Sequence, residues 1–304
     1  MGTPSIGTLG KLAIDVSTVT AITDFDAAST QLEFLSEELR YTEVQAYNNG
    51  IRGTRSRVAE RVRIAQGAVS GSIVLHPTPV ELDVLFPLIL GGAEVADSFT
   101  LAETIPEFGV LVERVNRRFV YTGCRVSRAT FSGTQGQPIT LRLDIEGETE
   151  IVSATAWPGT IPAINSGSPY IFADTTFSLA ADASAAEVRS FEIVIDNGLI
   201  TDRYMNSVNR QTIPSGDRVV SLSMSVPYTP DEVDLHKQAL AGGSGSITLT
   251  NGSTSTVFTF GNLKTDPAVS PVIGSRGSEI LLGLQMKAYR TGSTLELAVT
   301  HDST

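Results

Sequence analysis

Hydrophobic and polar residues alternate from Val69 to Leu75, and a helical pattern follows directly after them in VSGSIVLHPTPVELDVLFPLILGG, residues 69–92. The alternation is typical of a β-strand with one buried face. Thr78 is a good N-cap, and Pro79 suits the first helical position because its missing N–H has no partner there in any case. Glu81 falls in the first turn, where the helix dipole favours a negative charge. The segment therefore predicts a strand followed by a short helix that stops at Gly91-Gly92.

The same pattern occurs again, in a degraded form, from Val220 to Gly243 (VSLSMSVPYTPDEVDLHKQALAGG). Pro79 aligns with Pro230 and Gly92 with Gly243, at a constant offset of 151 (230 − 79 and 243 − 92). A second pair of blocks, 119–147 and 257–288, shares an aromatic strand, a glycine turn and a closing alternating strand, with an offset of 141 on the last strand (280 − 139). We interpret the chain as a tandem duplication in which each copy holds strands around one short helix.

The copies predict a division into two domains. We expect a first domain at 1–157 with an N-terminal arm, a linker at 158–169 rich in Pro, Gly, Ser and Ala, and a second domain at 170–304. Residues 11–22 favour a strand or an ordered arm, and an arm there would satisfy its backbone groups by pairing with a neighbour. Trp157 beside the linker is interpreted as its packing anchor.

Composition supports a mainly β protein and narrows its function. The 304 residues include 41% hydrophobic and 18% charged residues, and the net charge is −11. Such a charge argues against a protein whose main task is to grip nucleic-acid phosphates. The single cysteine, Cys124, excludes an intrachain disulfide. We expect no membrane partner, because no apolar run approaches the roughly 18 residues that span a bilayer.

Charges are split within residues 31–63. Glu33, Glu37, Glu38 and Glu43 precede Arg52, Arg55, Arg57, Arg61 and Arg63, with the turn signal Asn48-Asn49-Gly50 among them. One interpretation is a hairpin whose strands pair opposite charges. A second is an extended loop or hairpin that docks its arginines on an acidic face of another subunit. A third, an arginine patch for DNA, fits the net charge least well.

No catalytic or ligand-binding pattern emerges. The histidines, His76, His236 and His301, share no metal-ligand spacing, and we interpret them as surface or partly buried residues. Cys124 follows an aromatic strand without a placed histidine, which favours a small core residue over a nucleophile. The sequence therefore predicts no enzyme, no cofactor and no metal. A duplicated β protein without an active site is typically an assembly or binding protein.

Several stretches resemble the tail tube proteins of siphophages, the bacteriophages with long, flexible, non-contractile tails. The resemblance is spread over most of the chain, and its order carries more weight than any one motif. The segments that carry it are Arg52–Arg55, Gly71–Ile73, Pro77–Leu82, Ile89–Gly92, Tyr121–Val126, Pro138–Glu146, Pro169–Phe172 and Phe191–Asn197.

The resemblance implies a small β-sandwich or barrel with one flanking helix, repeated six times in each ring of the tube. Two such domains in one chain would need three copies for a pseudo-hexameric ring, and rings would stack into a hollow tube with an acidic lumen. Implied partners are the chain itself, the tape measure protein that fills the tube during assembly, and the tail tip and tail terminator proteins. Genome DNA would pass through the lumen without specific binding. The implied location is the virion tail, with assembly in the host cytoplasm.

Within that assembly, Glu37, Glu38, Arg52, Arg55 and Arg57 are candidates for an inter-ring contact, with the acidic and the basic segments as its two faces. The main alternative is a β-sandwich module for binding or capsid decoration, which should expose a cluster of aromatic residues. A contractile-tail or secretion tube has a closely related fold, and the duplication disfavours it only weakly.

Overall fold

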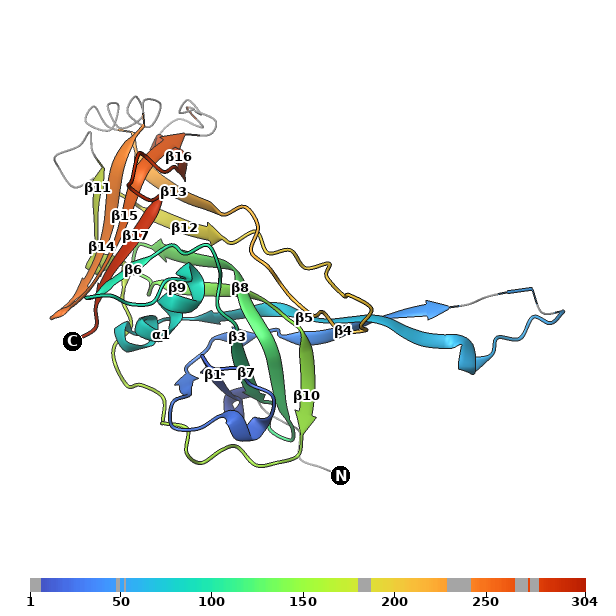
Figure 1. Ribbon diagram of the computed structural model, residues 1–304. Helices are drawn as coiled ribbons and strands as arrows, with labels where there is room; N and C mark the ends of the chain where they lie inside the picture. The colour runs from blue at the N-terminus through green and yellow to red at the C-terminus, as the bar shows by residue number, and fades with distance from the viewer. Residues whose placement is uncertain are drawn as a thin grey trace.

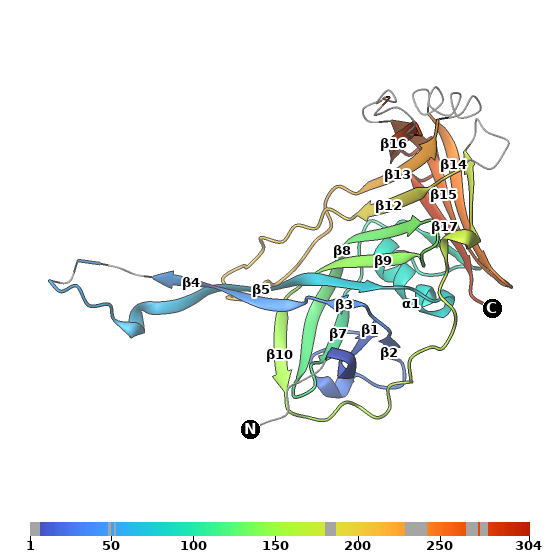
Figure 2. The same ribbon diagram turned by 180° about the vertical axis from the view of Figure 1, so that it is seen from behind.

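The computed structural model (Figures 1 and 2) describes residues 7–47, 50–51, 53–179, 187–228, 242–265, 273 and 279–304, apart from the side chain of Thr8. The chain is mainly β, as predicted, and every pairing between named strands is antiparallel. All of these strands belong to one connected sheet network. Because strand pairing within one network does not by itself define two packed sheets or a closed barrel, the expected β-sandwich or barrel stays a prediction.

The part of the chain before the predicted linker holds ten strands and one α-helix among its described residues. In order these elements are η1 (Gly7–Leu9), β1 (Lys11–Asp15), η2 (Ile22–Asp24), β2 (Thr30–Leu32), β3 (Ser36–Glu37), β4 (Arg40–Tyr47), η3 (Ala59–Arg61), β5 (Val62–Leu75), α1 (Pro79–Leu90), β6 (Ser98–Thr100), β7 (Phe108–Glu113), β8 (Arg118–Thr134), β9 (Thr140–Gly147) and β10 (Thr149–Ser153).

The described elements after the predicted linker are η4 (Phe172–Asp174), β11 (Thr175–Leu179), β12 (Ser190–Asp196), β13 (Val219–Pro227), β14 (Gly243–Asn251), β15 (Thr254–Thr265), β16 (Leu281–Ala288) and β17 (Leu297–Asp302). The helix predicted before Gly243 lies at 229–241, outside the described residues.

Helix α1 forms where the sequence predicts it. The N–H of Glu81 donates to Thr78 Oγ1 at 3.4 Å, and the N–H of Thr78 donates to Glu81 Oε2 at 2.8 Å, which closes a capping box. Gly91 ends the helix in the left-handed conformation at φ 86°, where a side chain would be strained. The helix is buried along Leu82, Leu85, Phe86, Leu88, Ile89 and Leu90, so it packs into the core and not onto its surface.

The long strand β8 connects two regions of the sheet network. Its first part, up to Cys124, pairs with β7 and β10. Its second part pairs with β9 on one side and with β12 on the other. This second part is the middle of a continuous central sheet with the order β4–β5–β9–β8–β12–β13–β16.

One hydrophobic cluster runs through the chain from Leu12 to Val299 and includes both sequence-predicted copies. Phe86 on α1 lies at its centre, with ring contacts to Phe99, Phe131 and Phe258 at centroid distances of 5.4, 6.1 and 6.0 Å. A smaller cluster packs below β1 and includes Phe25, Leu111 and Ile161, with Trp157 against it. The packing role of Trp157 is therefore confirmed, while the two-domain division stays a prediction.

The N-terminal segment differs from expectation. Strand β1 pairs with β2 and β7 of its own chain, and not with a neighbour, because both of its edges are hydrogen-bonded internally. The strand ends at Asp15, earlier than predicted, and residues 22–24 form a separate 3-10 turn, whose Asp24 accepts from the N–H groups of Thr20 and Ala21.

Candidate functional site

The central sheet has one face in the core and one open face. Along each of its strands, apolar residues such as Val69, Ile193 and Leu222 point into the core, and the residues between them form the open face. Hydroxyl side chains dominate that face: Ser70, Thr130, Ser132, Thr134, Thr140, Ser190, Ser221, Ser223 and Ser225. Small hydroxyl residues give a smooth surface that offers hydrogen bonds but little charge.

Charges on the open face are largely balanced. Arg128 pairs with Asp196 at 2.5 Å, and Arg142 with Asp144 at 2.9 Å. Glu146 at the edge of the same face pairs with Arg210 at 2.5 Å. The face is therefore not the strongly acidic surface that the net charge of −11 alone would suggest.

A shallow hollow of about 480 Å³ lies over β8, β12, β13 and β16 on this face. Its polar lining comes from Ser132, Thr134, Ser190, Glu192, Ser223, Ser225 and Gln285, and Gly283 leaves space on β16. The central sheet is therefore hollowed on its polar side.

The central sheet has an open edge at β4. At β4, the only strand paired with it among the described residues is β5. Gly67, opposite Glu43, donates its N–H to the carbonyl of Val208 at 2.8 Å, so Glu43 and Gly67 are a non-hydrogen-bonded pair. The N–H and C=O of Glu43 therefore point outward, away from β5. An open strand edge of this kind is a template for pairing with another chain.

Beyond this edge the β4–β5 hairpin leaves the body as a long ribbon (Figures 1 and 2). We call residues 43–66 the arm, a segment distinct from the N-terminal arm expected from the sequence. Its described side chains are exposed apart from the half-buried Val58, with Tyr47 at 60% and Ile51 at 106% of full exposure, so no core supports it. A two-stranded hairpin without packing is marginally stable in water. The arm therefore has the properties of a segment that acquires its partner on assembly.

The base of the arm is held by the loop 197–218, which we call the clasp. Tyr41 Oη donates to Asn209 Oδ1 at 2.6 Å, and Gly67 bonds to Val208. Arg210 of the clasp reaches the carbonyl of Val69 at 3.4 Å and is 9% exposed. These contacts fix the direction in which the arm leaves the body.

The candidate contact residues lie in different surroundings. Arg55 and Arg57 are exposed on the arm and form no ion pair with any described residue, and Arg52 lies outside the described residues. Glu38 is exposed beside β3. Glu37 is bound within the chain: its side chain is 7% exposed and pairs with Arg114 at 2.7 Å.

The hairpin predicted over residues 31–63 is present in β4 and β5, but its register does not pair the opposite charges. Glu43 faces Gly67, and Arg63 faces Ala46. The structure thus brings the glutamates and arginines together neither across the hairpin nor elsewhere in a single copy, as far as its described residues show.

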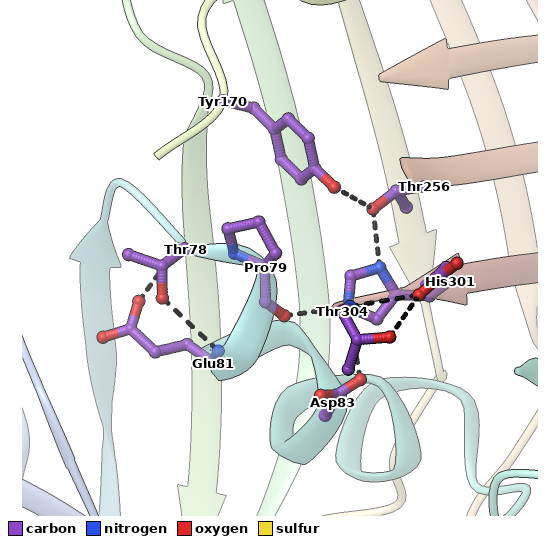
Figure 3. A network of polar contacts seen from close by, with 9 residues as sticks. Thr78, Pro79, Glu81, Asp83, Tyr170, Thr256, His301 and Thr304 are labelled. Carbon is purple, nitrogen blue, oxygen red and sulfur yellow. Dashed lines mark hydrogen bonds and ion pairs between the residues drawn. The ribbon is translucent and has the colours of Figure 1, made fainter. Parts of the chain in front are cut away.

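A polar network joins α1 to the last strand (Figure 3). His301 Nδ1 lies 2.8 Å from Thr256 Oγ1, and His301 Nε2 lies 3.3 Å from Asp83 Oδ1. The sequence of residue types resembles a hydrolase triad, but Thr256 is 0% and His301 1% exposed. No substrate reaches this hydroxyl, so the network is structural. The sequence analysis interpreted His301 as a surface or partly buried residue, whereas it is fully buried and shares the inward alternation of Leu297 and Val299.

Burial raises the pKa of two further reactive groups, Cys124 and Glu148. Cys124 is fully buried, and burial raises the pKa of its thiol far above the ordinary value, as expected for a core residue. The pKa of Glu148 is raised to about 7, first by burial and then by the nearby Glu107. Among the described residues, no three His, Cys, Asp or Glu side chains cluster as a metal site, and no helix is long and apolar enough to span a membrane.

A family model described as phage tail tube protein matches residues 7–283. No curated protein matches the chain. The chain therefore belongs to the phage tail tube protein family, whose members are non-enzymatic structural components of the virion tail and polymerise with themselves.

Proposed function

We propose that this chain forms the tail tube of a siphophage, with two tail-tube domains in each chain, three chains in each ring, and rings stacked into a conduit for DNA. The tape measure protein would fill the lumen during assembly, and the tail tip and tail terminator proteins would meet the two ends of the tube. The observation that carries the ring model is a repeated strand register.

The pairing of β5 with β9 has a counterpart in that of β13 with β16. Leu75 faces Leu141 in the first pair, and Val226 faces Leu282 in the second. The offsets between these residues are 151 (226 − 75) and 141 (282 − 141). These are the same offsets that the sequence repeat gives, although strand pairing was no part of that alignment. The agreement supports a duplication.

A bulge is repeated as well. The β7–β8 register shifts between Phe108, opposite Cys124, and Val110, opposite Tyr121. The β14–β15 register shifts between Gly243, opposite Leu263, and Gly245, opposite Phe260. The two residues on β7 align with the two on β14 at one offset, 135 (243 − 108). The two residues on β8 align with the two on β15 at another constant offset, 139 (263 − 124). Because a bulge is a specific local feature, its recurrence at equivalent positions is a second argument for two related domains.

Ring closure follows from the same equivalence. Tyr41 faces Val69 on β5, and Ile195 faces Val220 on β13, so β4 and β12 occupy equivalent places in the two domains. The outer edge of β12 pairs with β8 of the first domain. We infer that the open edge of β4 pairs in the same way with the second domain of the next chain. The residues equivalent to the second part of β8 continue from β15 and fall largely outside the described residues.

Three chains joined in this way would place three central sheets, each with strands from two domains, around a pore. The open face would line it, because the other face is committed to the core. Hydroxyl groups and paired charges suit a conduit through which DNA slides without being held, and the net negative charge of the chain would oppose phosphate binding. Described aromatic side chains lie mainly in the core, which disfavours the alternative of a binding or capsid-decoration module.

The test is negative-stain electron microscopy of the purified protein over a range of concentrations, together with the mass of any ring. Hollow tubes or rings with apparent sixfold symmetry and the mass of three chains are expected. Rings with six chains would refute the pseudo-hexamer, and a protein that stays monomeric at all concentrations, even with tail tips added, would refute the tube.

A further inference from the structure

We propose that the outer edge of β10 binds an extended segment of a different virion protein, which adds to it as an antiparallel strand. We call this edge, residues 149–153, the strand site. The proposal rests on the proposed function, because it compares the two related domains of one chain. The equivalent strand in the second domain, β17, is paired on both of its edges, whereas β10 pairs only with β8 among the described residues.

Strands β10 and β17 occupy equivalent places in the two domains. Strand β10 pairs with the first part of β8, where Val152 faces Phe119. Strand β17 pairs with β15, where Val299 faces Phe258. The offset between Phe119 and Phe258 is 139 (258 − 119), the same value that relates the bulges of β8 and β15. Val152 and Val299 are therefore equivalent residues, at an offset of 147 (299 − 152).

The second domain shows how such an edge is covered. Strand β6, from the first domain, pairs with β17, and Phe99 faces Val299. The N–H of His301 donates to the carbonyl of Asp97 at 2.7 Å, so Val299, two residues earlier, also turns its backbone groups toward β6. Phe99 and Val299 are both fully buried, and the ring centroids of Phe99 and Phe86 on α1 are 5.4 Å apart. A short added strand thus buries the apolar residues of this edge.

The strand site lacks this cover in the part of the chain that the structure describes. Val152 is 55% and Ile151 38% exposed. Phe119 is only half-buried, and the guanidinium of Arg114 lies over its ring, 4.5 Å from the centroid. The sequence of the site, TEIVS, contains neither lysine nor proline, two residues that commonly protect a free edge against pairing. The site is therefore an unprotected template for a further strand.

The neighbouring chain of the proposed ring lacks a segment equivalent to β6. In the alignment of the two copies, Gly243 corresponds both to Gly92, which follows α1, and to Phe108, which begins β7 (offsets 151 and 135). The 16 positions between Gly92 and Phe108 (108 − 92) therefore have no counterpart in the second domain, and β6 lies among them. The contact that covers β17 inside one chain cannot be repeated between chains, which is why the proposal assigns the added strand to a different protein.

A partner on the strand site would leave the conduit free. Strand β10 extends the layer formed by β1, β7 and the first part of β8, whose Val112 and Tyr121 belong to the same hydrophobic cluster as Val69 of the central sheet. This layer therefore lies on the opposite side of the core from the open face. Strand β10 is at the margin of the layer, on the side from which the arm projects (Figures 1 and 2). A ring of three chains would carry three strand sites.

The side chains of the strand site define the chemistry of the partner. Opposite Val152 the partner should carry a bulky apolar residue, as β6 carries Phe99 opposite Val299. Two positions further along the partner, beside Glu150, a basic residue is expected. Glu150 is equivalent to Leu297 (297 − 147) and forms no ion pair with any described lysine or arginine. Backbone hydrogen bonds would supply affinity, and these two side chains would supply specificity.

The experiment is disulfide trapping with a synthetic peptide of residues 95–101, the β6 segment, in which Leu101→Lys supplies the basic residue. Ser98 faces Thr300 in the covered edge, and the residue equivalent to Thr300 is Ser153 (300 − 147). A peptide with Ser98→Cys should therefore form a disulfide with the Ser153→Cys protein in a glutathione buffer. The Cα atoms of such a non-hydrogen-bonded pair lie about 4.5 Å apart, within the range of a disulfide.

The register provides the matched control. A peptide with Thr100→Cys is expected opposite Ile151, so its disulfide with the Ser153→Cys protein should be about tenfold less abundant, and the Ile151→Cys protein should reverse this preference. Adding Val152→Lys should abolish trapping, whereas Val95→Lys, at an exposed valine outside the strand site, should not change it. The natural Cys124 is fully buried and does not compete.

The outcomes separate the strand site from the proposed function. Trapping with the expected register on both the unassembled protein and assembled tubes, at one peptide per chain, supports the site. Trapping on the unassembled protein alone would show that another copy of this chain covers β10 in tubes, and trapping without a register preference would show that no strand is added; either result overturns the proposal. If the wild-type chain forms neither rings nor tubes, the proposed function fails, while trapping on the single chain still decides whether β10 binds a strand.

Discussion

His301 Nε2 lies 2.8 Å from the carbonyl oxygen of Pro79, although 222 positions separate the two residues in the chain. A carbonyl oxygen only accepts, so Nε2 carries the proton and donates. On the other side of the ring, Nδ1 contacts Thr256, whose hydroxyl lies 3.2 Å from that of Tyr170 (Figure 3). The first turn of α1, strand β15, the residue after the predicted linker and strand β17 are thus joined by one buried histidine.

Replacing that histidine should destabilise the fold. His301→Ala leaves a cavity and removes the partners of Thr256 and of the Pro79 carbonyl, so we expect a loss of about 2–4 kcal/mol in the free energy of unfolding. Urea denaturation followed by circular dichroism measures it. Thr256→Val, which removes the hydroxyl contacts to His301 and Tyr170 but keeps the volume, should cost less than His301→Ala. Equal stability of wild type and His301→Ala would show that the network contributes nothing.

The stability of the chain should also depend on Glu148. Burial raises its pKa from the usual 4.5 to about 7; Glu107 adds to the increase and Arg125 opposes it. An unfolded chain releases this proton near pH 4.5, whereas the folded chain keeps it until about pH 7. The favourable contribution of the protonated form is therefore complete below pH 4.5 and is lost as the pH rises through this window.

Glu148→Gln removes this titration. The variant should gain stability relative to the wild type as the pH increases from 4.5 to 7, and the difference should stay constant above that. Thermal unfolding at a series of pH values measures the difference. The exposed Asp202→Asn serves as the control for the loss of one carboxylate and should show no such rise. A wild-type and a Glu148→Gln profile that run parallel would contradict the prediction.

Removing the arm should separate assembly from folding. Replacing residues 48–61 by Asn-Gly joins β4 to β5 by a tight turn, and none of the described residues that it discards belongs to a hydrophobic cluster. We expect the unfolding midpoint to change by less than a few degrees, whereas rings no longer stack into tubes. Differential scanning calorimetry and electron microscopy of the same sample give the two readouts. Tubes of normal length from the shortened chain would exclude the arm from stacking.

Local signals in the sequence predicted local structure well. The Thr78–Glu81 capping box and the Gly91 stop define α1 at both ends, and the alternation of Leu141, Leu143 and Ile145 defines β9. At the turn between β14 and β15, Gly252 has a φ of 64°, a conformation that favours glycine. In each case residues only a few positions apart determine the conformation.

Contacts between distant segments were not predictable from one sequence. Strand β6 is three residues long and pairs with β17 some 200 positions later, a pairing that depends on the whole fold. The pairing of Glu37 with Arg114 likewise depends on β3 and β7 being neighbours in space, which the charge pattern of residues 31–63 could not reveal. The strained turn at Ala96 and Asp97 gave no signal at all, because neither residue favours a positive φ strongly enough to predict one.

Ring closure through the β4 edge gives the last prediction, and adjacent residues provide its control. The N–H of Glu43 points away from β5. The equivalent residue, Asn197 after β12, points its N–H away from β13 and donates it to the carbonyl of Ser127 at 2.8 Å. Glu43→Pro should therefore remove one hydrogen bond to the neighbouring chain and none within its own. Rings should form less readily while the monomer stays as stable as the wild type.

Thr42→Pro acts on the other edge of the same strand. Thr42 is opposite Ala68 in the next pair of the ladder, where the backbone groups of an antiparallel pair face each other. This change should lower the stability of the monomer by about 1–3 kcal/mol, because it removes a ladder hydrogen bond inside the chain and leaves its acceptor unpaired. Size-exclusion chromatography with light scattering reports ring formation, and urea denaturation reports stability. If Glu43→Pro forms rings at wild-type concentration, the free edge of β4 is not the closing surface, and the ring must be built from another edge.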